Sequence, residues 1–162
     1  MATRFEVLME IHTMDGQAVS FKQDGQRFTD PTTVKMCVDE KYNLCLRFRP
    51  PCKLLAWSMH DKDLSFEEEK QPITKKEQDM AAYSAVWTIH GFNKTRNGKR
   101  DSLRIRLELE DDHVLQTAMQ VKFYDSKDGT ASKWGQPMHA LDLSCDSKPG
   151  DHFVNVRRGS IL

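Results

Sequence analysis

Strict alternation of apolar and charged residues in the stretch 103–110 constrains the fold of this chain more than any other feature. The stretch reads LRIRLELE, so every second residue is apolar. Successive side chains of a β-strand point to opposite faces, so this spacing predicts a strand with one buried face and one wet face. Such strands are typical of antiparallel sheets. The residues expected to be buried are Leu103, Ile105, Leu107 and Leu109, and those expected to be exposed are Arg104, Arg106 and Glu108.

The same period of two recurs along most of the chain. Strands are expected at 5–11, 18–23, 33–38, 43–49, 54–59, 64–68, 83–89, 103–110, 114–124, 138–145 and 152–157. Asp-Gly and Asn-Gly pairs, which tolerate positive φ, separate several of them. The charged stretch 67–79 has no pattern and is expected to be a connection with one helical turn at 74–80. The spacing predicts an all-β fold, an antiparallel β-sandwich or flattened barrel, as a single domain over residues 1–162.

Composition excludes several classes of function. Lysine plus arginine and aspartate plus glutamate number 24 each, which argues against a general binder of nucleic acid or anionic membranes. No apolar run approaches the roughly 20 residues of a membrane span, and the first residues do not resemble a signal peptide. We therefore expect a cytoplasmic protein. The four cysteines form no C-x-x-C pair, which favours buried thiols over a zinc site.

No motif in the chain predicts catalysis, so no catalytic, metal-binding or cofactor-binding residue is expected. Residues 91–99 have the wrong glycine spacing for a phosphate loop. The stretch Asp125–Gly129 resembles the first half of a calcium loop, but with Gly129 at the sixth position the twelfth is Gly135, which supplies no bidentate carboxylate. The six histidines are scattered. These observations favour a binding protein over an enzyme.

Basic residues gather around the Asn97-Gly98 pair. One interpretation is a hairpin tip that its charge keeps soluble. The other is a contact surface for an acidic partner or for lipid headgroups. The candidate contact residues are Lys94, Arg96, Lys99 and Arg100.

Four short motifs occur in an order and spacing that resembles the cannabinoid receptor-interacting protein 1 family. They are DGQRF at 24–28, QVKFY at 120–124, Trp134-Gly135-x-Pro137, and the closing Ser160-Ile161-Leu162. The resemblance covers essentially the whole chain, although the middle, about 50–115, matches mainly in pattern. One departure is Met119, which stands where the family usually carries a tryptophan.

The resemblance implies a cytosolic, non-enzymatic adaptor that binds the cytoplasmic tail of a G-protein-coupled receptor, the type 1 cannabinoid receptor, and modulates its signalling or trafficking. It also implies a fold similar to the immunoglobulin-like sandwich of Rho guanine-nucleotide dissociation inhibitors. That fold suggests an alternative, a carrier that holds a lipid or lipidated protein between its sheets and acts with membrane-trafficking small GTPases. The expected cavity residues are Phe5, Val7, Met9, Leu107, Met119, Val121 and Phe123.

Trp134 follows the strand expected at 114–124 and a polar connection expected at 125–133, which we interpret as a hairpin loop. A tryptophan in a loop either packs its ring against the end of the sandwich or contacts a partner. We favour packing, because an exposed indole is rare without a use, and keep Trp134 as a candidate partner contact.

The last residues of the sequence match a PDZ-domain ligand. Such a ligand adds a strand to the domain, with its carboxylate in a backbone nest, Leu162 in the pocket and a hydrogen bond from Ser160. The family resemblance supports this pattern, and the alternative is an ordinary frayed terminus. The hypothesis requires residues 159–162 to form an exposed tail.

Overall fold

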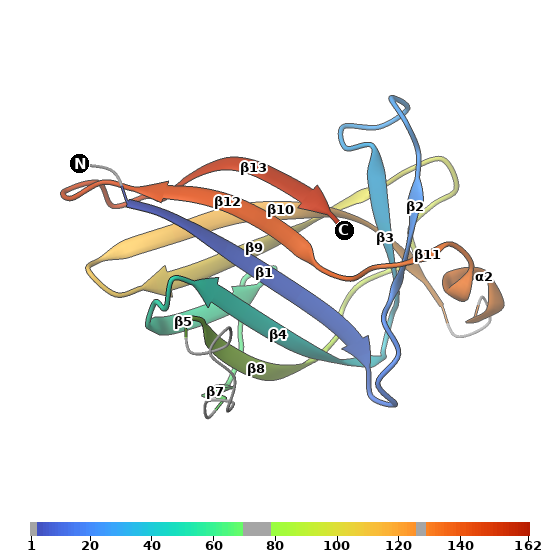
Figure 1. Ribbon diagram of the computed structural model, residues 1–162. Coiled ribbons are helices and arrows are strands. Elements are labelled where there is room, and N and C mark those ends of the chain that lie inside the picture. The colour runs from blue at the N-terminus through green and yellow to red at the C-terminus, as the bar shows by residue number, and fades with distance from the viewer. Residues whose placement is uncertain (1–2, 70–78, 126–128) are drawn as a thin grey trace.

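The computed structural model describes residues 3–69, 79–125 and 129–162, and most of them lie in β-strands. The strands form two sheets packed face to face, which confirms the predicted β-sandwich (Figure 1). The similarity to Rho guanine-nucleotide dissociation inhibitors stays a prediction. The helical turn expected at 74–80 lies almost entirely outside the described residues.

Sheet A has six strands in the order β13-β12-β1-β4-β8-β7. Its strands are β1 (Thr3–Thr13), β4 (Lys41–Arg49), β7 (Phe66–Glu68), β8 (Ala81–Thr88), β12 (Leu141–Ser147) and β13 (Asn155–Ile161). Every neighbouring pair in this sheet is antiparallel. The alternating sequences of β1, β4 and β8 form its centre.

Sheet B has seven strands in the order β11-β2-β3-β10-β9-β5-β6. Its strands are β2 (Ser20–Gln23), β3 (Thr32–Cys37), β5 (Leu54–Met59), β6 (Lys62–Asp63), β9 (Asp101–Leu109), β10 (His113–Tyr124) and β11 (Gln136–Pro137). A short helix, α2 (Gly129–Lys133), precedes β11. Figure 1 shows β2, β3, β11 and α2 together at one end of the molecule.

The register predicted for β9 is confirmed. All four apolar residues of the stretch are buried, and the charged residues between them are exposed or half-exposed. The same alternation holds in β4, where Leu44, Leu46 and Phe48 point inward. Inward side chains from both sheets form one hydrophobic core with Trp57 and Trp87 among its largest fully buried members. Hydrophobic burial across this shared interface is what holds the two sheets together.

One strand pair departs from the antiparallel prediction. β3 runs parallel to β10, with Val34 opposite Val121 and Lys35 opposite Lys122. The chain leaves β3 through Asp39, which has a φ of 61°, and enters β4 in the other sheet. β3 pairs antiparallel with the preceding strand β2 on one side, and on the other side it pairs with β10, which comes much later in the sequence. Sheet B is therefore mixed.

The connection after β10 is not the hairpin that we expected. The chain passes through α2 and then into β11, which pairs with β2 and not with β10. Similarly, the basic segment around Gly98 is not a hairpin tip, because it carries the chain from β8 in sheet A to β9 in sheet B. Alternation alone predicts strands, but it does not predict which strands become neighbours.

A short bridge joins the sheets at the end of the molecule opposite α2. Val114 donates its N–H to His152 O (2.8 Å) and accepts from the N–H of Val154 (2.8 Å). This bridge ties β10 of sheet B to the segment that leads into β13 of sheet A. The bridge thus links the two sheets at this corner of the sandwich.

Candidate functional site

Three of the sequence motifs meet at the end of the molecule formed by β2, β3, β10 and α2. Gln120, first residue of the QVKFY motif, holds the loop that follows the DGQRF motif. Its amide accepts from the N–H of Asp30 (3.1 Å) and donates to Asp30 O (2.9 Å) and Thr33 Oγ1 (2.9 Å). Gly135 of the third motif lies against Phe21 of β2, where a Cβ atom would meet the Phe21 carbonyl oxygen at 2.5 Å. The motifs therefore build one continuous surface.

Arg100 is a structural residue and not the exposed partner contact that we predicted. Its side chain is 5% exposed and paired with Asp24, with Nε 3.0 Å from Oδ2 and Nη2 3.1 Å from Oδ1. The guanidinium also lies over the Phe28 ring, 4.3 Å from its centroid. Burial alone would raise the pKa of Asp24, but hydrogen bonds from Arg100 and Thr33 lower it below its usual value. The pair fixes the DGQRF loop onto β9.

The outer face of β2, β3 and β10 carries Lys22, Lys35 and Lys122, which we call the lysine face. Lys35 is only 7% exposed, and its Nζ donates to Ala131 O of α2 (3.0 Å). Lys35 and Lys122 both lie over the Tyr124 ring, 5.7 and 5.1 Å from its centroid. Burial is the largest cause that lowers the pKa of both Lys35 and Lys122, and repulsion from Lys22 is the next largest. These positive charges lie on one surface at a cost in electrostatic energy.

The lysine face was not predicted from the sequence. Each of its lysines alternates with apolar residues in its own strand, which is visible in the sequence. Their proximity follows from the parallel pairing of β3 and β10, which the alternation does not predict.

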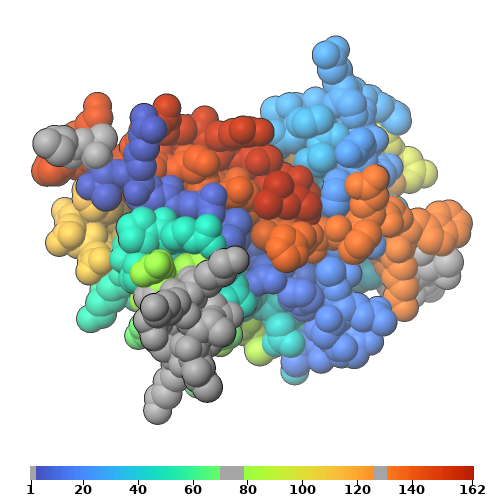
Figure 2. Space-filling model, viewed as in Figure 1, coloured from blue at the N-terminus to red at the C-terminus, as the bar shows by residue number. Residues whose placement is uncertain are grey.

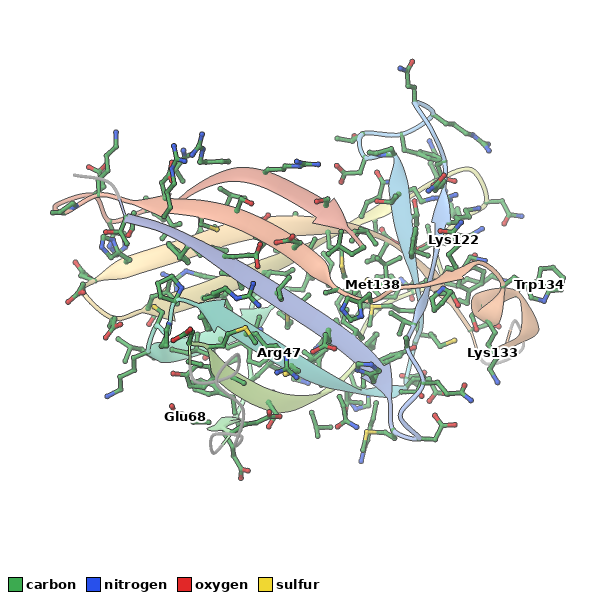
Figure 3. All side chains as sticks on the ribbon, in the orientation of Figure 1. Arg47, Glu68, Lys122, Lys133, Trp134 and Met138 are labelled. Carbon is green, nitrogen blue, oxygen red and sulfur yellow. The ribbon has the colours of Figure 1, made fainter. Side chains whose placement is uncertain are left out.

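Trp134 does not pack against the sandwich as we favoured. Its side chain is 66% exposed, and Figure 3 shows it projecting from the end of the molecule beyond Lys133 and Lys122. Gly135, the next residue, adopts a φ of 125° where its backbone lies close to Phe21. Because the Trp134 ring is exposed, partner contact is the interpretation that remains for it.

The remaining predicted partner contacts lie beside the lysine face. Lys94, Arg96 and Lys99 line a groove of about 410 Å³ on the segment between β8 and β9. Phe92 and Phe123, whose ring centroids are 4.8 Å apart, form its floor. A partner role for these three basic residues stays a prediction.

The residues expected to line a lipid cavity fill the core. Phe5 is partly buried and packs against it. The other six are buried: Val7, Met9, Leu107, Met119, Val121 and Phe123. A lipid chain between the sheets would have to displace these side chains. This packing does not specifically favour the carrier alternative, which stays a prediction.

The expected exposed C-terminal tail is wrong for residues 159–162. β13 pairs with β12 through Ile161, opposite Leu141, and through Ser160, opposite Asp142. Leu162 is half-exposed but continues the pairing, since its N–H donates to Ala140 O (2.8 Å). β12 pairs with β1 along one edge, and the C-terminal segment supplies hydrogen-bond partners for the backbone groups along its other edge. A PDZ domain could reach Ser160 and Leu162 only after these pairings open.

β13 itself forms an open edge of sheet A, and Figure 2 shows it in red on the surface of the molecule. On the outer face of sheet A, a groove of about 540 Å³ runs from β13 across β12 and β1 to β4. We call it the arginine groove after the arginines that line it: Arg4, Arg49, Arg157 and Arg158. Asp146 lies within 4.0 Å of Arg4 and of Arg157, and Glu6 faces Arg49. The groove is thus more basic than acidic.

Within the described ranges, no group of three or more histidine, cysteine, aspartate or glutamate residues could hold a metal ion. The described part of the chain also contains no helix that is long and apolar enough to cross a membrane.

Comparison with known protein families gives a match along nearly the whole chain. The family model described as CB1 cannabinoid receptor-interacting protein 1 matches residues 1–160. The chain belongs to this family. Members from Homo sapiens, Mus musculus and Bos taurus, each named CB1 cannabinoid receptor-interacting protein 1, are 25% identical to it over 163 aligned residues. The alignments cover 98% of this chain and 95% of each relative.

At 25% identity this chain is a distant member of the CB1 cannabinoid receptor-interacting protein 1 family. The names of these relatives refer to binding a receptor, and none refers to an enzymatic reaction. The match extends over the strands of both sheets and is not confined to one local motif.

Proposed function

We propose that this protein is a non-enzymatic adaptor that binds the cytoplasmic tail of a membrane receptor and modulates its signalling or trafficking. Membership of a family whose relatives are named for interaction with the CB1 cannabinoid receptor supports the proposal. The structural observation that carries it is the open edge of β13.

Strand addition is the binding mode that this edge favours. β13 has seven residues, whereas the other strands at the sheet edges, β7, β6 and β11, have three, two and two. An extended peptide needs a row of backbone N–H and C=O groups of comparable length, which only β13 offers among the described edge strands. The receptor tail pairs with β13 and extends sheet A by one strand.

The arginine groove gives this edge a charge preference. Arg158 has no carboxylate within 4.0 Å among the described residues, and Arg157 is half-exposed on the edge strand itself. Acidic side chains of a paired peptide complement these arginines, and exposed charged contacts mainly set partner choice and association rate. The same arginines discourage pairing between two copies of β13.

Titration of the purified protein with a soluble peptide of the CB1 receptor's cytoplasmic tail, followed by calorimetry, tests the proposal. We expect binding, with slower hydrogen exchange in β13 on addition of the peptide. The double variant R157E/R158E should weaken binding roughly tenfold or more, because it replaces two attractive contacts by repulsive ones. The control K41E/K62E makes the same charge change elsewhere and should leave affinity within about twofold. Protection of another element while β13 exchanges as before would reject the strand-addition mode.

A further inference from the structure

The lysine face carries positive charge that the described protein does not neutralise. Both carboxylate oxygens of Asp24 are bonded to Arg100, and the Nζ of Lys22 lies 3.9 Å from one of them. Within residues 3–69, 79–125 and 129–162, no carboxylate lies within 4.0 Å of the Nζ of Lys35 or Lys122. An external anion would therefore relieve repulsion that the fold leaves in place.

Trp134 lies directly beside this charge. The Ala131 carbonyl oxygen accepts hydrogen bonds from Lys35 Nζ (3.0 Å) and from the backbone N–H of Trp134 (3.3 Å). The indole therefore projects from a residue that lies one turn of chain beyond the contact with Lys35. Figure 3 shows it at the same end of the molecule as Lys122. An amphipathic ring flanked by lysines is characteristic of proteins that contact the headgroup layer of a bilayer.

The two ends of β10 differ in local charge. The C-terminal end of this strand carries Lys122, and its N-terminal end follows the exposed acidic turn Glu110-Asp111-Asp112. Twelve residues of strand separate the two ends by roughly 40 Å. The formal net charge is zero, so attraction to an anionic surface has to come from a local concentration of positive charge such as the lysine face.

We propose that the end of the molecule formed by the lysine face and Trp134 docks on the anionic surface of a membrane leaflet. Lys22 and Lys122 contact lipid phosphates, Lys35 adds its charge from beneath them, and Trp134 enters the headgroup layer. The projecting indole favours a lipid surface over a phosphorylated peptide, because an exposed amphipathic ring beside lysines suits the headgroup layer. This inference goes beyond receptor-tail binding, since β13 and the arginine groove take no part in it.

Sedimentation with vesicles of phosphatidylcholine alone, or with one-third phosphatidylserine, tests the proposal. We expect binding only to the vesicles that contain phosphatidylserine, and weaker binding as salt is raised, because screening shortens the reach of the charges. Tryptophan fluorescence gives an independent readout. Trp57 and Trp87 are buried, so a blue shift on binding reports Trp134. The variant W134F should lose that shift.

The decisive comparison uses two double variants with equal changes in charge. K22E/K122E should reduce partition onto the anionic vesicles more than about twentyfold, since each lysine near such a surface is worth roughly fivefold and its reversal more. K62E/K148E changes exposed lysines away from this end and should retain most of the binding. Circular dichroism of both variants verifies that they are folded.

Three outcomes would overturn the proposal. They are the absence of binding to anionic vesicles, an equal loss in both double variants, and unchanged Trp134 fluorescence on bound vesicles. Binding of a soluble phosphoserine peptide at Lys22 and Lys122 without vesicle binding would assign the site to a peptide. The receptor-tail titration contains no lipid, so its result is independent of this one.

Discussion

At the residue scale, the Arg100–Asp24 pair is the polar contact on which the motif-bearing end depends. Replacing Arg100 by Ala should cost about 3–5 kcal/mol of unfolding free energy, because it leaves the buried Asp24 carboxylate without its partner. Urea denaturation measures the loss. The neighbouring exposed Lys99 provides the control, and K99A should cost less than about 0.5 kcal/mol. Equal costs for the two variants would contradict the buried-pair assignment.

Cys145 should make stability depend on alkaline pH. Burial, with smaller effects from Asp146 and Asp142, raises the pKa of its thiol to about 12 from an ordinary value near 9. The folded state therefore keeps a proton that the unfolded state loses. The stabilisation is complete below pH 9 and disappears as the pH rises toward 12.

The measurement is urea denaturation at pH 8 and pH 10, with C145A beside the natural protein. We expect the pH-dependent loss of unfolding free energy to be about 1 kcal/mol smaller in C145A, whatever the variant's absolute stability. Comparing slopes with pH removes the cost of the cavity that the substitution leaves. Identical slopes would mean that Cys145 ionises as readily in the folded state as in the unfolded one.

At the element scale, alternation predicted the strands well and their neighbours poorly. β9 shows why, since LRIRLELE specifies which face is buried without specifying which strand lies beside it. α2 and β11 escaped prediction because they are short and are held by contacts with β2 and β3. Arg100 looked like surface charge because the sequence could not show that Asp24 lies next to it. The local sequence pattern therefore does not predict which distant segments of the chain pair with one another.

The predicted register of β9 has a direct energetic consequence. Leu107 is fully buried, so L107A should cost about 2–5 kcal/mol through lost burial and the cavity left behind. On the opposite face of the strand, Arg106 pairs with Glu108 at the surface, and R106A should change stability by less than about 1 kcal/mol. Thermal or urea unfolding of the two variants provides the comparison. A surface variant as damaging as the core variant would reject the one-wet-face arrangement.

At the scale of the whole molecule, equal numbers of positive and negative residues concealed an uneven distribution. Composition gives only the total charge, whereas docking on a membrane depends on the field at one end of the molecule. Three of the four motifs of the resemblance meet at that end, while β13 has its edge on sheet A. The two proposed binding surfaces therefore belong to different parts of the sandwich.

Because that core is shared by both sheets, the molecule should unfold as a single unit. Trp57 belongs to β5 of sheet B and Trp87 to β8 of sheet A, and both are buried. In W134F these two tryptophans alone report on unfolding, one from each sheet. We expect their fluorescence and the far-ultraviolet circular dichroism to change together over one urea transition. Two transitions, or probes with different midpoints, would mean that one sheet survives without the other and that the inter-sheet core contributes less than its burial implies.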